Sequence, residues 1–209
     1  MHRRSPWFLL LVAAIVTYPF VVHFNLLADR PLHAVIGLFV VLAIGLLVSL
    51  AYRNRNAATI IALAILGCAL VLNQVGTLQA LYLPPIAFNA GLCALFASTL
   101  RPGKMPLITR YILKMEGEVP PELVPYSRNL TRIWAGFFAL MALTSTLLAL
   151  YAPTAIWSLF TNFINYLLVL LLLGGEYFMR EKLFPHRQQR GFINFLRRLI
   201  ATNFHRHHE

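Results

Sequence analysis

The sequence predicts an all-α integral membrane protein, a bundle of about six transmembrane helices with two short amphipathic helices at the membrane surface. Hydrophobic residues make up 59% of the 209 positions and charged residues only 12%. The mean hydropathy of +0.69 lies well above the range of soluble domains. The chain also contains six long apolar stretches, and nearly all of its Lys and Arg lie before the first stretch, after the last one, or in every second connection between them.

Each apolar stretch is long enough to cross a bilayer. A spanning helix needs about 20 apolar residues, because every backbone N–H and C=O in lipid must be paired within the helix. We treat residues 1–179 as a six-span transmembrane domain with a loop at 101–129, and residues 180–209 as a basic amphipathic tail. The expected spans are Pro6–Phe24, Ala34–Tyr52, Ala57–Val75, Leu83–Leu100, Leu130–Tyr151 and Trp157–Met179.

The first stretch has a second interpretation. MHRRSPWFLLLVAAIVTYPF combines a basic start with an apolar run, as a secretory signal does. No clear small-x-small cleavage site closes the run, so we expect a retained membrane helix. Cleavage would leave five spans in the same orientation, so the charge pattern does not exclude it.

The basic residues indicate the orientation, because Lys and Arg near the ends of spans resist translocation whereas Asp and Glu count for little. Seventeen of the 18 basic residues fall on one side of the membrane, and Arg30 is the exception. We therefore expect a bacterial inner-membrane protein with both termini and the 101–129 loop in the cytoplasm. This topology accounts for most of the net charge of +11, and we expect no nucleic-acid partner because no binding module accompanies it.

The fourth stretch carries small residues at intervals of four, which predicts a flat face for close helix approach and a central position. Pro84 and Pro85 are expected at or near its outer end; a helix that begins near Gln79 would instead contain them and be kinked. Cys68 and Cys93 fall inside apolar stretches and are interpreted as packing residues. The small residues are Ala87, Ala90, Gly91, Ala94 and Ser98.

The 101–129 loop predicts a short helix in the headgroup region that begins after Pro106 and ends at Gly117. Its prolines, in EVPPELVPYS, argue against a continuous helix, so Ser127 or Asn129 is expected to cap the fifth span. The expected apolar face is Leu107, Ile108, Tyr111, Ile112 and Met115, opposite Thr109, Arg110, Lys114 and Glu116.

Two interpretations of this loop stay open. It is either a solvated connector with one interfacial turn, or a docking surface for a partner or for lipid. As a docking surface, it offers the acids Glu116, Glu118 and Glu122 to a protein partner, and Arg110 and Lys114 to anionic headgroups.

The tail predicts a second interfacial helix in GFINFLRRLIATNF, with one apolar face opposite its arginines. Arg190, Arg197 and Arg198 are expected to bind anionic lipid headgroups. The final HRHHE has three clustered histidines, but a chain end seldom forms a closed metal site, so we expect no metal.

Ionisable residues at membrane depth often indicate function, because an unpaired charge there is costly. Arg132 and Glu176 lie at similar depth in the fifth and sixth stretches and are expected to pair, either as a structural ion pair or as part of a polar site. Arg180, one turn after Glu176, competes for it. The residues Asn73, Asn89, Asn162 and Asn165 are expected to form interhelical hydrogen bonds.

Enzyme signatures are not found: the sequence has no G-x-S-x-G elbow, H-E-x-x-H motif, P-loop or Gly-rich dinucleotide turn. His23, Asp29 and His33 lie near the outer face and would be able to act together, but interfacial loop residues are the simpler interpretation. We therefore assign no catalytic residue and no cofactor, and a role other than catalysis is favoured.

A family resemblance adds a pathway. PLITRYILKMEGE, followed by NLTRIWAGFFALMAL and IWSLFTNF, is similar to the second half of the intracellular septation protein A family, small bacterial inner-membrane proteins linked to the cell envelope and division. The whole chain resembles more closely a small membrane-protein family that accompanies aryl polyene (xanthomonadin-type) pigment and lipid biosynthesis genes in Gram-negative bacteria. The resemblance is clearest from Leu83 to Phe184 and carries over no active-site residues.

The resemblance implies an accessory or scaffold protein for envelope lipid or aryl polyene biosynthesis, which binds partners or lipid at its cytoplasmic face. A lipid-modifying enzyme and a small lipid or metabolite transporter are the alternatives. Some members are labelled ketosynthases, and this sequence departs from that label. A thiolase-type ketosynthase needs a nucleophilic Cys with His partners in a large α/β fold, whereas both Cys here lie in apolar stretches that contain no His.

The charge pattern gives a topology prediction. Cysteines introduced by Arg55→Cys, Glu118→Cys and Gln188→Cys should be shielded from a membrane-impermeant thiol reagent in intact cells, whereas Asp29→Cys should react, because only Asp29 lies in an outer connection. Labelling of the Glu118→Cys variant in intact cells would refute the orientation.

Overall fold

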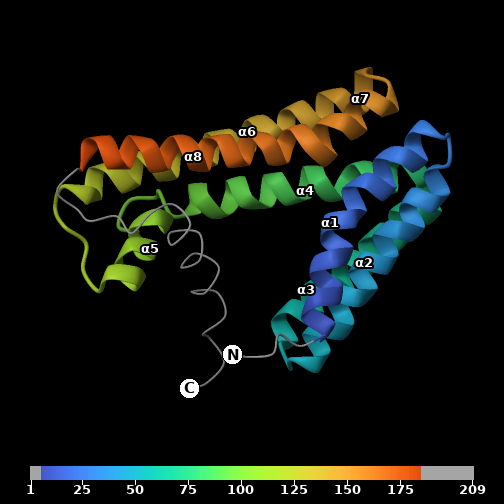
Figure 1. The fold of residues 1–209 in the computed structure, drawn as a ribbon, viewed down its shortest axis with the longest axis horizontal. Helices are drawn as coiled ribbons and strands as arrows, with labels where there is room; N and C mark the ends of the chain where they lie inside the picture. The colour runs from blue at the N-terminus through green and yellow to red at the C-terminus, as the bar shows by residue number, and fades with distance from the viewer. Residues whose placement is uncertain (1–5, 185–209) are drawn as a thin grey trace.

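The computed structural model describes residues 6–184, which form helices joined by short turns and contain no strand (Figure 1). Six helical segments in this range are long and apolar enough to cross a membrane, which confirms the all-α membrane fold. The elements are α1 (Pro6–Leu27), α2 (Pro31–Ala51), α3 (Arg55–Gln74), α4 (Thr77–Ser98), α5 (Leu107–Glu116), α6 (Leu123–Tyr151), α7 (Thr154–Leu159), the π-helical turn η1 (Phe160–Ile164) and α8 (Asn165–Leu183).

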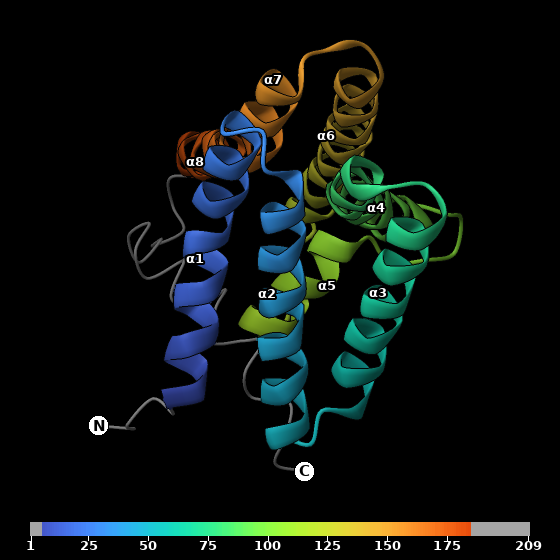
Figure 2. The ribbon, with the colours of Figure 1, turned by 90° about the vertical axis from the view of Figure 1, so that its right-hand side faces the viewer.

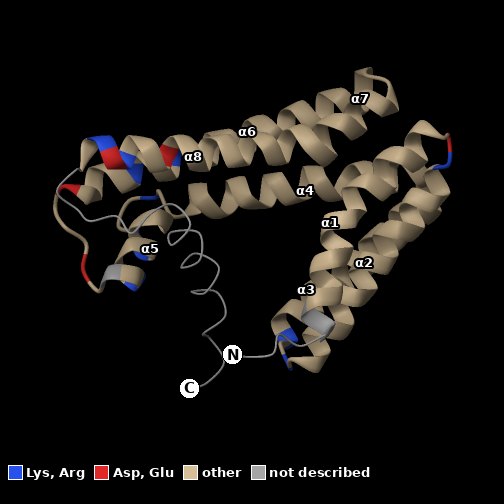
Figure 3. Cartoon of the chain, viewed as in Figure 1, with Lys and Arg blue, Asp and Glu red and all other residues tan. Residues whose placement is uncertain are grey.

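The spanning helices form two groups. Helices α1, α2 and α3 lie side by side and make an N-terminal arm, while α4, α6 and the continuous α7–η1–α8 segment make a C-terminal arm (Figures 1 and 2). The arms meet at one end, the junction, and diverge towards their other ends. In Figure 3 the blue Lys and Arg ribbons gather mainly at the diverging ends, as expected if those ends share one side of the membrane.

The junction is built on a buried apolar cluster that draws on four helices. Trp157 of α7 is only 2% exposed, and its ring lies 4.5 Å from that of Tyr82 of α4. Gly76 makes the sharp turn from α3 into α4 with a φ of +124°, a conformation that costs glycine little and other residues much. The cluster contains Val22, Leu26, Ala34, Val35, Ala80, Leu81 and Trp157.

A second apolar cluster lies inside the C-terminal arm. Trp134 and Phe138 of α6 stack with centroids 5.5 Å apart, and Phe96 of α4 lies 5.5 Å from Phe138. Leu172 and Leu173 of α8 pack on the same cluster. Helix α4 therefore holds the central position that was expected for it.

The reason given for that central position was wrong. Helix α4 meets α6 through Leu92, Cys93 and Phe96, while Ala87 and Gly91 on the small-residue face are exposed and a Cβ at Gly91 would touch nothing. Large side chains make the contact because they bury more apolar area than a flat face does. Cys93 packs in this cluster as expected, and both cysteines are free.

Helix α4 begins at Thr77 and contains Pro84 and Pro85, which is the second of the two placements left open by the sequence; the prolines are not at its outer end. Neither proline has an N–H to donate to the carbonyl four residues earlier. Asn89 is 2% exposed, and its side-chain Nδ2 donates to the Pro85 carbonyl at 2.9 Å. This asparagine therefore serves its own helix rather than the interhelical contact that was expected.

Helix α6 begins at Leu123, well before the expected Leu130. Pro125 falls in the first turn, where its missing N–H costs little. Ser127 is therefore inside the helix and fully buried, which corrects its expected role as an N-cap. The 29 residues of α6 span about 44 Å at 1.5 Å per residue, more than the roughly 30 Å of a hydrocarbon core.

The sixth span is also longer than expected and is not a regular helix. It covers the 30 residues Thr154–Leu183 and contains the π-helical turn η1 in place of a regular α-helical turn. The apolar run shows where the span lies but carries no sign of the π turn, because such a turn changes the register without changing the composition.

Candidate functional site

The candidate site is the end of the C-terminal arm farthest from the junction. It consists of α5, the first turns of α6 and the last turns of α8, and we call it the α5 end. Figure 1 shows α5 lying beside the start of α6, and the two helices are in direct contact. Because α6 and the sixth span exceed the thickness of a bilayer core, this end has the length to reach the headgroup layer and beyond.

Helix α5 is fixed by hydrogen bonds to side-chain hydroxyls of its neighbours. The Leu107 amide donates to Thr99 Oγ1 at 3.0 Å, and the Ile108 amide donates to Thr131 Oγ1 at 3.4 Å. These amides belong to the first turn of α5, where a helix leaves its N–H groups without intrahelical partners. A hydroxyl at the C-terminal end of α4 and another in α6 therefore accept hydrogen bonds from the first amides of α5.

A buried hydroxyl pair strengthens this attachment. Thr109 Oγ1 and Ser127 Oγ lie 2.7 Å apart, and both residues are at most 3% exposed. Thr131 Oγ1 also donates to the Ser127 carbonyl at 2.7 Å. An unpaired hydroxyl in such a place is costly, so the pair favours one position of α5 on α6.

The faces of α5 differ from the prediction at one position. Thr109 was expected on the polar face, but it is buried against α6 because its hydroxyl meets Ser127. Arg110, Leu113 and Lys114 are exposed, and Arg110 Nε donates to the Met105 carbonyl at 2.9 Å. Gly117 ends the helix with a φ of +81°, as expected for a glycine stop.

The acidic residues follow this helix directly. Glu116 is the last residue of α5, and Glu118 and Glu122 are exposed in the connection to α6. Figure 3 shows this acidic connection beside the basic residues of α5. The α5 end therefore presents both charge signs within a short distance along the chain.

Glu176 forms a salt bridge with Arg180 and not with Arg132. Arg180 Nε lies 2.9 Å from Glu176 Oε1, and the Tyr126 hydroxyl donates to the same oxygen at 3.4 Å. Glu176 is 8% exposed. The competing pair forms because residues four apart on one helix lie on the same face.

Arg132 lies elsewhere. It is exposed on α6, and its Nη1 donates to Asn129 Oδ1 at 2.7 Å. The prediction that Arg132 pairs with Glu176 is therefore wrong. Asn129 lies on the surface of α6 and does not cap the helix, contrary to its predicted role. Tyr126, which the sequence analysis did not single out, is the residue that links α6 to Glu176 of α8.

A second polar group lies at the junction, where the sequence analysis grouped His23 with Asp29 and His33. The structure instead brings His23 Nδ1 within 3.1 Å of Ser158 Oγ, from α1 to α7. Asn162 Nδ2 donates to the Ser158 carbonyl at 2.9 Å and to Ser158 Oγ at 3.1 Å. Asn162 thus bonds within its own span, contrary to the expected interhelical role.

This junction group ties the two arms together. Ser158 is fully buried, so its hydroxyl is not presented to a substrate. The spacing of Ser158 and Asn162 indicates a contact within one helix, but His23 and Ser158 are 135 positions apart and nothing in the sequence links them. The group has the geometry of a structural contact.

The remaining predicted residues divide into two sets. Arg110 and Lys114 lie exposed on α5. Arg190, Arg197 and Arg198, the second amphipathic helix and the HRHHE end lie outside the described residues. Within residues 6–184, no three His, Cys, Asp or Glu side chains come together in a way that would hold a metal ion.

Comparison with known proteins adds no relative: no family model, no curated protein and no solved structure matches the chain.

The ion pair gives a stability prediction. Arg180→Ala should destabilise the protein by about 3 kcal/mol, because it leaves the Glu176 carboxylate buried without its cation. Arg132→Ala, a matched control, should change stability by less than about 0.5 kcal/mol because Arg132 is exposed. Unfolding in mixed detergent micelles measures both values.

A rescue variant sharpens this test. Glu176→Gln removes the charge that Arg180 balances, so the Arg180→Ala and Glu176→Gln double variant should be more stable than Arg180→Ala alone. Equal losses for Arg132→Ala and Arg180→Ala, with no rescue by Glu176→Gln, would contradict the assigned pair.

Proposed function

We propose that this protein is an accessory or scaffold protein of the bacterial inner membrane that supports envelope lipid or aryl polyene biosynthesis. In this role it binds partner proteins and lipid headgroups at its cytoplasmic face through the α5 end. The pathway comes from the resemblance of the chain, clearest over Leu83 to Phe184, to the aryl polyene-associated family. The manner of action comes from the geometry of α5.

The observation that carries the proposal is the fixed attachment of α5. A simple connector has no need of hydroxyls from Thr99, Ser127 and Thr131 to hold a short helix in one position. A binding surface does benefit, because a helix that is already ordered loses less conformational freedom when a partner docks. This attachment favours the docking interpretation of the 101–129 loop over the solvated connector.

The charges on this surface suit two kinds of ligand. Arg110 and Lys114 are exposed cations, and each such residue near anionic headgroups contributes about 1 kcal/mol. Glu118 and Glu122 are repelled by the same headgroups, so they are better suited to a basic protein surface, where complementary charge speeds association. We therefore assign lipid binding to the cations and partner binding to Glu116, Glu118 and Glu122.

The alternatives have less support. A lipid-modifying enzyme would need an accessible polar group, but the Glu176 carboxylate is buried and engaged by Arg180 and Tyr126. A transporter would more often have helices broken near mid-membrane, whereas α4 continues through Pro84 and Pro85.

The proposal is tested by deleting the gene and profiling envelope lipids and pigments. The deletion strain should show an altered profile, and wild-type protein should restore it. The triple variant Glu116→Gln, Glu118→Gln and Glu122→Gln should accumulate normally, because interactions of charges at the surface contribute little to stability, yet restore the profile poorly. Asp29→Asn, which removes an acid at the opposite end, is the control and should restore it fully.

Two results would count against the proposal. An unchanged lipid and pigment profile after deletion would contradict the proposed role in envelope lipid or aryl polyene biosynthesis. Full restoration by the triple variant would return the loop to the role of a solvated connector.

A further inference from the structure

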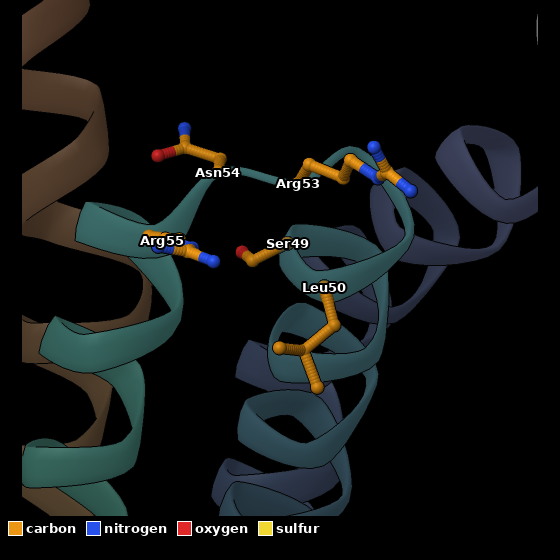
Figure 4. Close-up of a pocket in the computed structure, with 5 residues that line it drawn as sticks. All are labelled: Ser49, Leu50, Arg53, Asn54 and Arg55. Atoms are coloured by element: carbon orange, nitrogen blue, oxygen red, sulfur yellow. The ribbon is translucent and has the colours of Figure 1, made fainter.

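A pocket of about 400 Å³ lies in the turn between α2 and α3, at the end of the N-terminal arm away from the junction. Its volume falls in the range of roughly 300–1,000 Å³ that is usual for small-molecule sites. Figure 4 shows the five residues that line it, which are Ser49, Leu50, Arg53, Asn54 and Arg55.

The lining residues give the pocket a polar wall and an apolar wall. In Figure 4 the Arg55 side chain extends towards the Ser49 hydroxyl, while Leu50 points away from the turn along the helix bodies. Arg53 projects outward from the turn. Leu50, Arg53 and Arg55 are exposed and Ser49 is partly buried. This order of cation, hydroxyl and apolar side chain matches an amphiphile with an anionic head.

The positive charge of this pocket has no acidic partner among the residues that the structure describes. The sequence has no acid between Asp29 and Glu116, and neither Arg53 nor Arg55 forms a salt bridge with the residues that the structure describes. Both arginines also flank the N-terminus of α3, where the helix dipole is positive and a cation is unfavourable. An anion bound in the pocket would remove this repulsion.

The backbone of α3 is not the proposed anchor. The Asn54 side chain already accepts a hydrogen bond from the Ala57 amide at 3.1 Å and so caps the helix. The side chains of Arg55 and Ser49 are therefore the groups that remain to hold an anion. Guanidinium and phosphate form strong, charge-assisted hydrogen bonds, and a hydroxyl donates one more.

We propose that this pocket binds the phosphate group of an anionic phospholipid. Arg55 and Ser49 hold the phosphate, Arg53 adds positive potential, and Leu50 packs against the start of an acyl chain. The site lies on the other arm from the α5 end, so it goes beyond the function proposed above. Basic pockets at the ends of spanning helices are suited to acidic headgroups.

The full-length protein, purified in detergent, is tested by native mass spectrometry with added phosphatidylglycerol, phosphatidylcholine or inorganic phosphate. Phosphatidylglycerol should be retained in preference to phosphatidylcholine, and millimolar inorganic phosphate should not displace it. Arg55→Gln should weaken phosphatidylglycerol retention about fivefold, which corresponds to one lost headgroup contact of about 1 kcal/mol. Ser49→Ala should weaken it less.

Arg101→Gln is the matched control, because it removes one exposed cation from the turn between α4 and α5, outside the pocket. It should leave retention nearly unchanged. The Asp29→Cys change is combined with Arg55→Gln, and labelling of this cysteine in intact cells checks that the variant keeps the wild-type orientation. Thermal unfolding checks that the Arg55→Gln protein remains folded.

Three outcomes would overturn the proposal. Equal losses for Arg55→Gln and Arg101→Gln would mean that headgroups respond to total charge only. Displacement of the lipid by inorganic phosphate would assign the pocket to a soluble anion. A folded Arg55→Gln protein that retains lipid normally but inserts with reversed orientation would show that Arg55 sets the orientation of the protein and does not bind lipid.

Discussion

The structure depends on one constraint: backbone N–H and C=O groups in hydrocarbon must find their partners within the protein. This constraint makes the apolar stretches helical and continuous, and it explains why prolines fall where a lost N–H is tolerated. Pro125 lies in the first turn of α6, where no intrahelical donor is needed. Pro84 and Pro85 are exceptions, because they lie inside α4, where the carbonyls of Ala80 and Leu81 lose their helical donors. Even the π turn of the sixth span keeps a helical path from Thr154 to Leu183.

Where the chain leaves the apolar stretches, side-chain hydroxyls provide hydrogen-bond partners for backbone groups. Thr99 and Thr131 accept from the first amides of α5, and the Thr109–Ser127 pair closes the contact between α5 and α6. The result is a short amphipathic helix held on a rigid support rather than a loose loop. The proposed docking function follows from this rigidity, because an ordered surface binds at a lower entropic cost. The α2–α3 turn is a separate basic surface on the other arm, where we propose a site for the phosphate of a phospholipid.

Composition and periodicity were sufficient to predict the all-α membrane fold, the six spans and the glycine stop at Gly117, because these features depend on local chemistry. Features that depend on three-dimensional register were not predictable in the same way. Glu176 pairs with Arg180 because the two share a helix face, whereas Arg132, at similar depth in the sequence, donates a hydrogen bond to Asn129. Thr109 looks polar on a helical wheel, yet it is buried because Ser127 lies opposite it. The contact between His23 and Ser158 joins residues that no sequence spacing relates.

The central claim, that α5 is fixed on α6, is tested most directly by hydrogen–deuterium exchange of the protein in lipid nanodiscs. The account predicts slow exchange for the amides of residues 107–116 and fast exchange for the exposed connection 117–122, because only α5 has both its own helical bonds and the hydroxyl partners at its start. The variant Thr109→Val, which removes the buried hydroxyl pair while keeping a similar shape, should speed exchange in α5. Exchange of α5 in the wild-type protein as fast as that of the 117–122 connection would contradict the account.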